Sequence, residues 1–183
     1  MQIFFPKEKE LESRVSILPE TVKKLVGLGI RVEIEASFGK TLHLSDDVYV
    51  SYGASISKQR NSSLSSSDVI CRINKPVIEE IKILKKNSIH ISFLDPFNEI
   101  ELVREFANFK ISAISMELIP RITRAQKMDA LSSQANLGGY AAVIEASRRL
   151  GKSFPMMMTA AGTISPSKIF VIGVGVAGLQ AIA

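Results

Sequence analysis

Three glycines follow an apolar run near the carboxyl end of the sequence. Residues 169–178 read IFVIGVGVAG, which places Gly173, Gly175 and Gly178 after the run at spacings of two and three residues. Glycines at this spacing let a backbone approach a pyrophosphate, whose charge the N–H groups at a helix start can hold. The pattern predicts a strand over Lys168–Ile172, then a dinucleotide-binding turn that includes Val176 and Ala177, and then a helix.

The dinucleotide-binding unit is incomplete within these 183 residues, because five residues follow Gly178. The second strand of a βαβ unit would come later, as would the acidic residue that holds a ribose hydroxyl about 20 positions on. We therefore expect the amino-terminal part of a longer subunit, truncated at Ala183, that binds a dinucleotide weakly when alone.

Residues 119–135 form a polar segment with arginines, glutamines, an aspartate and serines. Connections longer than about 12–15 residues are usually functional or disordered. Arg121 and Asp129 could offer a donor and an acceptor to a ligand, or they could form an ordinary surface ion pair. The residues alone leave both interpretations open.

The first 118 residues alternate short apolar runs with helix-length segments. Parallel strands need such crossovers, so the order predicts an α/β fold with a doubly wound parallel sheet, Rossmann-like or flavodoxin-like. The expected strands are Gln2–Phe5, Ile30–Glu35, Ala54–Ile56, Val69–Ile73, Ile89–Phe93 and Ile111–Ser115. Helices are expected from Pro19 to near Gly29 and over Asp46–Tyr52, Ile78–Leu84, Glu99–Asn108 and Leu137–Leu150, the last capped by Asn136, with a surface turn over Arg60–Ser67.

We expect three parts along the chain. Residues 1–135 form an amino-terminal domain, and residues 136–164 form an interdomain helix and crossover. Residues 165–183 supply the first strand and glycine turn of an incomplete nucleotide-binding domain. In open α/β sheets, ligands bind where strands end at the carboxyl side.

Composition excludes several classes of function. One cysteine and two histidines are too few for a disulfide framework or a Cys/His metal centre, so no metal site is expected. The net charge of +5 comes from scattered basic pairs without interleaved aromatic residues, which argues against nucleic-acid binding. The apolar residues 169–183 fall short of the roughly 18–20 that a membrane span needs, and the amino terminus lacks a signal-peptide pattern.

Longer stretches resemble a known family. The segment PRITRAQKMDALSSQANLGGY at 120–140 closely resembles the signature loop and helix of the NAD(H)-binding alpha subunit of proton-translocating nicotinamide nucleotide transhydrogenase. FPMMMTAAGT at 154–163, GVGVAGLQAIA at 173–183 and the opening Pro6-Lys-Glu with Arg14-Val15 and Pro19 are similar to the same subunit. The resemblance therefore spans the whole chain.

This resemblance implies a function and a set of residues. Hydride would pass from NADH to NADP⁺ held by a partner beta subunit, coupled to proton translocation by membrane domains. The complete protein would be a homodimer at the cytoplasmic face of the inner membrane. The family loop implies nicotinamide-side contacts by Arg121, Gln126, Asp129 and Ser132, and the first three of these are the catalytic candidates. The resemblance of the glycine turn implies pyrophosphate contacts by Gly173, Gly175, Val176, Ala177 and Gly178.

Two other functions stay open. Alanine dehydrogenase shares the fold, and its substrate-binding arginine corresponds to Arg14. Asn74 and Asp95 stand where that enzyme has a lysine and a catalytic histidine, and neither can replace an ammonium or a near-neutral acid/base. The remaining possibility is a non-catalytic fragment that acts only as an interaction module.

Overall fold

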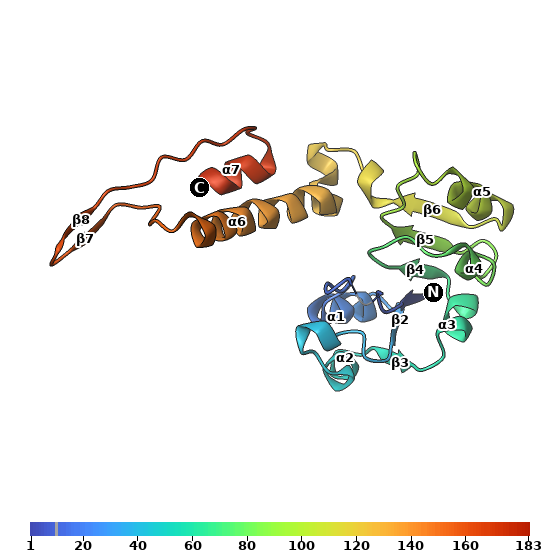
Figure 1. The fold of residues 1–183 in the computed structure, drawn as a ribbon. Coiled ribbons are helices and arrows are strands. Elements are labelled where there is room, and N and C mark those ends of the chain that lie inside the picture. The colour runs from blue at the N-terminus through green and yellow to red at the C-terminus, as the bar shows by residue number, and fades with distance from the viewer. Residues whose placement is uncertain (10) are drawn as a thin grey trace. The chain divides into compact units, whose positions relative to one another are not determined.

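The computed structural model describes residues 1–9 and 11–183, which fall into two compact units, Met1–Leu118 and Ile119–Ala183 (Figure 1). The domain borders expected after residues 135 and 164 remain predictions about the complete protein.

The first unit contains a six-stranded parallel sheet with the strand order β3-β2-β1-β4-β5-β6 (Figure 1). The order reverses between β1 and β4, which is the mark of a doubly wound sheet. The predicted α/β parallel fold is therefore confirmed. The strands are β1 (Gln2–Phe5), β2 (Arg31–Glu35), β3 (Ser55–Ser57), β4 (Val69–Cys71), β5 (Ile89–Ser92) and β6 (Ser112–Ser115).

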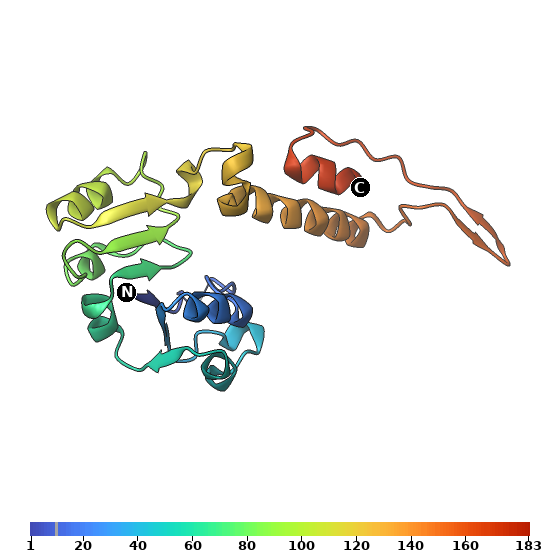
Figure 2. The same ribbon diagram turned by 180° about the vertical axis from the view of Figure 1, so that it is seen from behind.

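Successive residues of β1 face opposite sides of the sheet and join two separate cores. Ile3 and Phe5 pack with residues of α1 (Pro19–Gly27) and α2 (Asp46–Ser51). Phe4 is fully buried among residues of α3 (Arg60–Ser66), α4 (Ile78–Ile81) and α5 (Ile100–Asn108). Both faces of the sheet are thus covered, as Figure 2 shows from behind.

The serine-rich residues Arg60–Ser67 predicted a surface turn. This prediction is wrong, because Arg60–Ser66 form helix α3. Serine is a weak helix former, but tertiary packing overrides such propensities. Leu64 is only 1% exposed and belongs to the second core, and the Ser63 hydroxyl donates to Ser57 Oγ at 2.6 Å. Burial of Leu64 therefore holds a helix that the local sequence disfavours.

A charged network lies beside the second core. The Arg72 guanidinium is 1% exposed and contacts Glu80 at 2.5 Å, while Arg60 contacts Glu80 at 2.8 Å and also pairs with Glu35.

The His90 ring is buried against Phe106, and burial lowers the pKa of His90 to about 3. His90 is therefore neutral in the folded protein at ordinary pH.

The second unit contains the 3₁₀ segment η3 (Thr123–Met128), helix α6 (Ala130–Leu150), the strands β7 (Met157–Thr159) and β8 (Gly162–Ile164), and helix α7 (Val176–Ile182). α6 and α7 lie side by side in both ribbon views. Every helix in residues 1–9 and 11–183 is too short or too polar to cross a bilayer.

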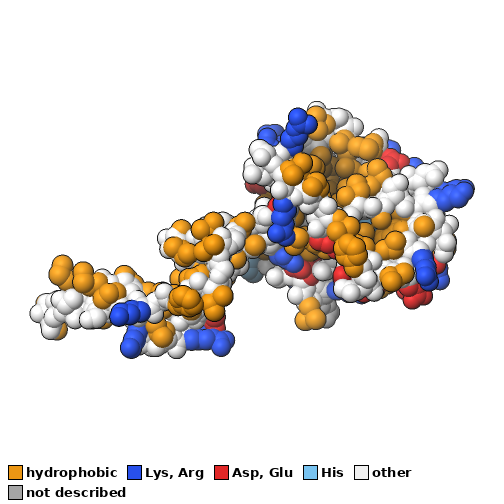
Figure 3. Space-filling view, turned by 90° about the horizontal axis from the view of Figure 1, so that it is seen from above, with side chains coloured by type: hydrophobic (Ala, Val, Ile, Leu, Met, Phe, Trp, Pro, Cys, Tyr) orange, Lys and Arg blue, Asp and Glu red, His pale blue; other side chains and the backbone are white. Residues whose placement is uncertain are grey.

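Two sequence expectations fail in this unit, and one pair of strands is unexpected. Helix α6 starts seven residues before Leu137 and is capped by Asp129 rather than Asn136. The residues Lys168–Ile172 form no strand in the part of the chain that the structure describes, where no neighbouring strand pairs with them. The sequence does not predict the antiparallel hairpin β7–β8, whose side chains are exposed. Figure 3 shows hydrophobic side chains along this part of the chain.

Candidate functional site

A cavity of about 340 Å³ in the second unit brings two separate sequence motifs together. The polar segment supplies Arg121 and the first turns of α6, and the glycine turn supplies the opposite wall. Seven of the nine predicted site residues line this cavity, namely Arg121, Ser132, Gly173, Gly175, Val176, Ala177 and Gly178. Leu131, Ala135 and Ile172 complete the lining.

The glycine turn is built from close backbone contacts. Gly173 has a φ of +93°, which is unfavourable for residues with a side chain. A Cβ at Gly178 would collide with the Gly173 carbonyl oxygen, so the third glycine is needed for the turn to close on itself. No atom lies within 4 Å of a Cβ at Gly175, which leaves that backbone open toward a ligand.

Asp129 lies directly behind the cavity wall as the cap of α6. Its carboxylate accepts hydrogen bonds from the Ser132 amide at 2.9 Å and the Ser132 hydroxyl at 2.6 Å. These two bonds, with a smaller contribution from the charge of Arg121, lower the pKa of Asp129. Within residues 1–9 and 11–183, however, no direct ion pair joins Arg121 to Asp129.

Gln126 is one of the two predicted residues that lie outside the cavity lining. It lies exposed on η3 and does not line the cavity. Its backbone carbonyl accepts a hydrogen bond from the Asp129 amide at 3.3 Å, so it contributes to the approach to α6. The cavity lining therefore leaves out the Gln126 side chain, as it does that of Asp129.

Sequence reasoning missed the contacts that tie α6 to α7. The Asn136 side chain donates to Gln180 Oε1 at 3.0 Å, and Gly139 packs against the backbone of Ala177. The spacing of Ser132, Asn136 and Gly139 could have indicated that these residues contact a common partner, because residues four and seven apart share one helix face. The sequence alone shows no partner for that face.

The first unit has a second polar cluster where the strand order reverses. Glu8, which follows β1, accepts hydrogen bonds from the Ile73 amide at 2.5 Å and the Asn74 amide at 3.3 Å. The Asn74 side chain also donates to Glu8 at 3.2 Å. The crevice in which open α/β sheets usually bind ligands is thus crossed by an internal carboxylate.

Arg14 is bound by a neighbouring carboxylate. Its Nε and Nη2 atoms donate to the two oxygens of Glu12 at 2.8 and 2.6 Å, which lowers the pKa of Glu12 to about 2. Glu8, Glu12 and Arg14 line a cavity of about 190 Å³. Asp95 has a φ of +52°, and its side chain accepts a hydrogen bond from Asn98 at 2.8 Å.

The doubly wound parallel sheet of the first unit defines the α/β Rossmann-like class, and the second unit carries a glycine turn at a helix start, as dinucleotide-binding proteins do. Within that class, the chain belongs to the alanine dehydrogenase/PNT family. The family's amino-terminal domain matches residues 4–138, and its carboxyl-terminal domain matches residues 142–183.

Known proteins of two kinds resemble this chain. An NAD(P) transhydrogenase alpha subunit of Rhodospirillum rubrum is 44% identical over the whole chain, which spans 49% of that protein. The transhydrogenase structure from Sinorhizobium meliloti is 43% identical with a TM-score of 0.92, covering 100% of this chain and 55% of the other. An L-alanine dehydrogenase structure, covered to 51% by the whole chain, has a TM-score of 0.83 at 24% identity, which shows a common fold.

All the stretches that carry the sequence resemblance lie inside the matches that cover the whole chain. The predicted membership of the transhydrogenase and alanine dehydrogenase family is therefore confirmed. The chain spans about half the length of the curated relatives from Rhodospirillum rubrum and Rickettsia prowazekii, 49% in each case.

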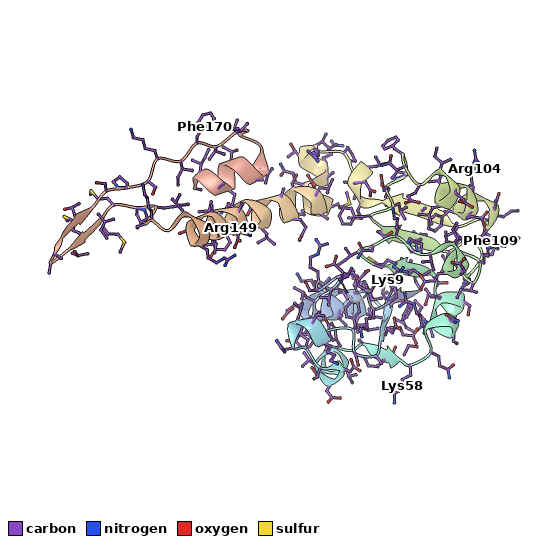
Figure 4. The ribbon with its side chains drawn as sticks, viewed as in Figure 1. Lys9, Lys58, Arg104, Phe109, Arg149 and Phe170 are labelled. Carbon is purple, nitrogen blue, oxygen red and sulfur yellow. The ribbon has the colours of Figure 1, made fainter. Side chains whose placement is uncertain are left out.

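Figure 4 labels Phe170, which is 88% exposed on the segment that leads to α7.

Proposed function

We propose that this chain is part of the NAD(H)-binding subunit of a transhydrogenase, in which hydride passes from NADH to NADP⁺. The observation that carries the proposal is the cavity in which Arg121 and Ser132 face the glycine turn. Hydride transfer between two nicotinamides needs no proton donor, so the protein's task is to place and orient the rings. Charged and polar side chains beside a phosphate-binding turn suit that task.

The residues divide the work by their chemistry. The open backbone around Gly175 offers N–H groups to the pyrophosphate. The Arg121 guanidinium offers several donors to the carboxamide or ribose of the nicotinamide half. Asp129 orients Ser132 through the 2.6 Å hydrogen bond to its hydroxyl, and Gln126 reaches from η3 toward the second nucleotide.

The remaining parts of the reaction belong to partners. We propose that a beta subunit holds NADP(H), that membrane domains couple hydride transfer to proton translocation, and that the subunit works at the cytoplasmic face of the inner membrane. A second copy of the chain would pack against the hairpin β7–β8 and the residue before it, since Met158 in β7 is 81% exposed and the preceding Met156 is 60% exposed. A dimeric mass in light scattering would support this pairing, and a monomer of the complete subunit would contradict it.

Titration with NADH tests the proposed function. Residues 1–183 are compared with the same residues joined to the carboxyl-terminal half of the Rhodospirillum rubrum relative. We expect the joined protein to bind NADH with micromolar affinity and residues 1–183 to bind it far more weakly. With the NADP(H)-binding partner added, the joined protein should reduce an NADP⁺ analogue at the expense of NADH. If the joined protein does not bind NADH, the proposal fails.

The alternative enzyme is an alanine dehydrogenase. Its reaction would need Arg14 to bind an oxo-acid carboxylate, yet Glu12 already binds the guanidinium through two hydrogen bonds. Asn74 donates to Glu8 and offers no cation. Pyruvate- and ammonium-dependent oxidation of NADH by the joined protein would favour this alternative. Co-purification with a beta subunit without turnover would favour a non-catalytic interaction module.

A further inference from the structure

Helices α6 and α7 touch at a buried glycine. Gly139 is the buried residue of α6, and a Cβ at this position would lie less than 3.0 Å from the Ala177 carbonyl oxygen. The same Cβ would lie 3.0 and 3.1 Å from the carbonyl carbon and Cα of Ala177. These are backbone atoms, so no side-chain rotation could relieve the collision.

Ala177 belongs to the wall of the candidate cavity. It directly precedes Gly178 and lines the cavity together with Gly173 and Gly175. The distance between α6 and the Ala177 backbone therefore sets the position of the glycine turn. A displaced α7 would carry the turn away from the opposite wall.

The opposite wall comes from the same face of α6. Ser132 and Gly139 are seven residues apart, which is about two helical turns, so they point in the same direction. Asn136 lies between them and donates to Gln180 of α7 at 3.0 Å. One helix face thus carries a cavity residue, a polar tie to α7 and the closest backbone contact.

We propose that Gly139 is a positioning residue. It fixes the distance between the glycine turn and Ser132 that NADH binding requires. This inference rests on the proposed function, because it assumes that the cavity takes NADH. The absence of a side chain at residue 139 lets the two backbones meet, and the pair Asn136–Gln180 restricts sliding of one helix along the other.

Gly138 provides a matched control. No atom lies within 4 Å of a Cβ at Gly138, whereas the neighbouring position meets Ala177. Both glycines lie inside α6, so alanine raises helix propensity equally at the two positions. A difference between Gly138→Ala and Gly139→Ala therefore reports the contact with α7.

The first measurement needs no ligand. In amide NMR spectra of residues 1–183, Gly139→Ala should shift the resonances of Gly173, Gly175 and Gly178, and Gly138→Ala should leave them in place. Circular dichroism checks that both variants keep their helices. Unchanged glycine resonances in Gly139→Ala would overturn the inference.

The second measurement is NADH affinity in the joined protein. Gly139→Ala should weaken NADH binding by tenfold or more, and Gly138→Ala should stay within twofold of the parent. If Gly139→Ala fails to fold, Asn136→Ala serves instead, with an expected twofold to fivefold loss. Equal affinity of the parent and the variant would overturn the inference, whereas a parent without NADH binding would overturn the proposed function instead.

Discussion

The Asp129 carboxylate holds the first turn of α6 through two hydrogen bonds to Ser132, from the amide at 2.9 Å and from the hydroxyl at 2.6 Å. Both residues belong to the proposed nicotinamide-side set, so the single carboxylate of that set already has a structural task. Asp129 acts on the site by setting where α6 begins and where the Ser132 hydroxyl points. Its helix cap and its proposed ligand role can be separated by substitution.

Replacement of Asp129 tests the cap. Asp129→Ala removes the acceptor for the Ser132 amide, and loss of such a cap costs about 0.5–2 kcal/mol of stability. Asp129→Asn keeps a side-chain oxygen and should lose much less. Urea unfolding of the three proteins measures the difference. Equal destabilisation by Ala and Asn would mean that the charge matters more than the cap.

Arg121 should matter for NADH affinity, and Arg124 should not. Arg121 lines the cavity, whereas Arg124 lies exposed on η3 outside it. Loss of a charged hydrogen bond costs about 1.5–3 kcal/mol, so Arg121→Gln should weaken NADH binding by roughly tenfold or more. Arg124→Gln makes the same change in charge, and this variant should bind NADH as tightly as the parent does. Similar losses in the two variants would point to a general charge effect.

Glu80 should stabilise the first unit strongly. Its carboxylate contacts Arg72 at 2.5 Å and Arg60 at 2.8 Å, and Arg72 is 1% exposed. Removal of one partner leaves a buried charge uncompensated, which costs about 3 kcal/mol or more. Glu80→Gln should therefore lower the free energy of unfolding by about that amount. The exposed neighbour Glu79 provides the control, because Glu79→Gln should change stability by less than about 0.5 kcal/mol.

His90 should make the fold sensitive to acid. Burial, and secondarily the charge of Arg72, lower its pKa from 6.5 to about 3, although Glu80 acts in the opposite direction. The unfolded chain therefore takes up a proton as the pH falls below about 6.5, while the folded chain does not. Stability should fall by up to about 1.4 kcal/mol per pH unit down to about pH 3.

A variant isolates the contribution of His90 from that of the acidic residues. His90→Gln keeps a polar group near Ser92, whose hydroxyl lies 3.2 Å from the His90 ring, but it cannot titrate. The difference in unfolding free energy between parent and variant should change steadily between pH 6.5 and pH 4. A constant difference over this range would show that His90 is protonated in the folded state or not buried.

The sequence predicted the sheet well because its strands are apolar and bounded by turns. Helix α6 shows the limit, since the polar residues after Asp129 resemble a loop until the cap is known. The serines of α3 became helical through burial of Leu64, which no local pattern reveals. The glycine turn was predicted from its own spacing, and the roles of Arg121 and Ser132 came from the family resemblance, whereas the Gly139 contact depends on two segments meeting in space.

The strand order of the sheet has a consequence for folding kinetics. β1 pairs with β2 across one helix, but its pairing of Ile3 with Val69 closes a loop of more than 60 residues. Long loops cost more entropy to close, and non-local pairings slow folding. Strands β1–β3 and β4–β6 should therefore form as two early halves. Phe4 of β1 packs in the second core with residues of the other half. This packing would then be the late step that joins the two halves into one cooperative sheet.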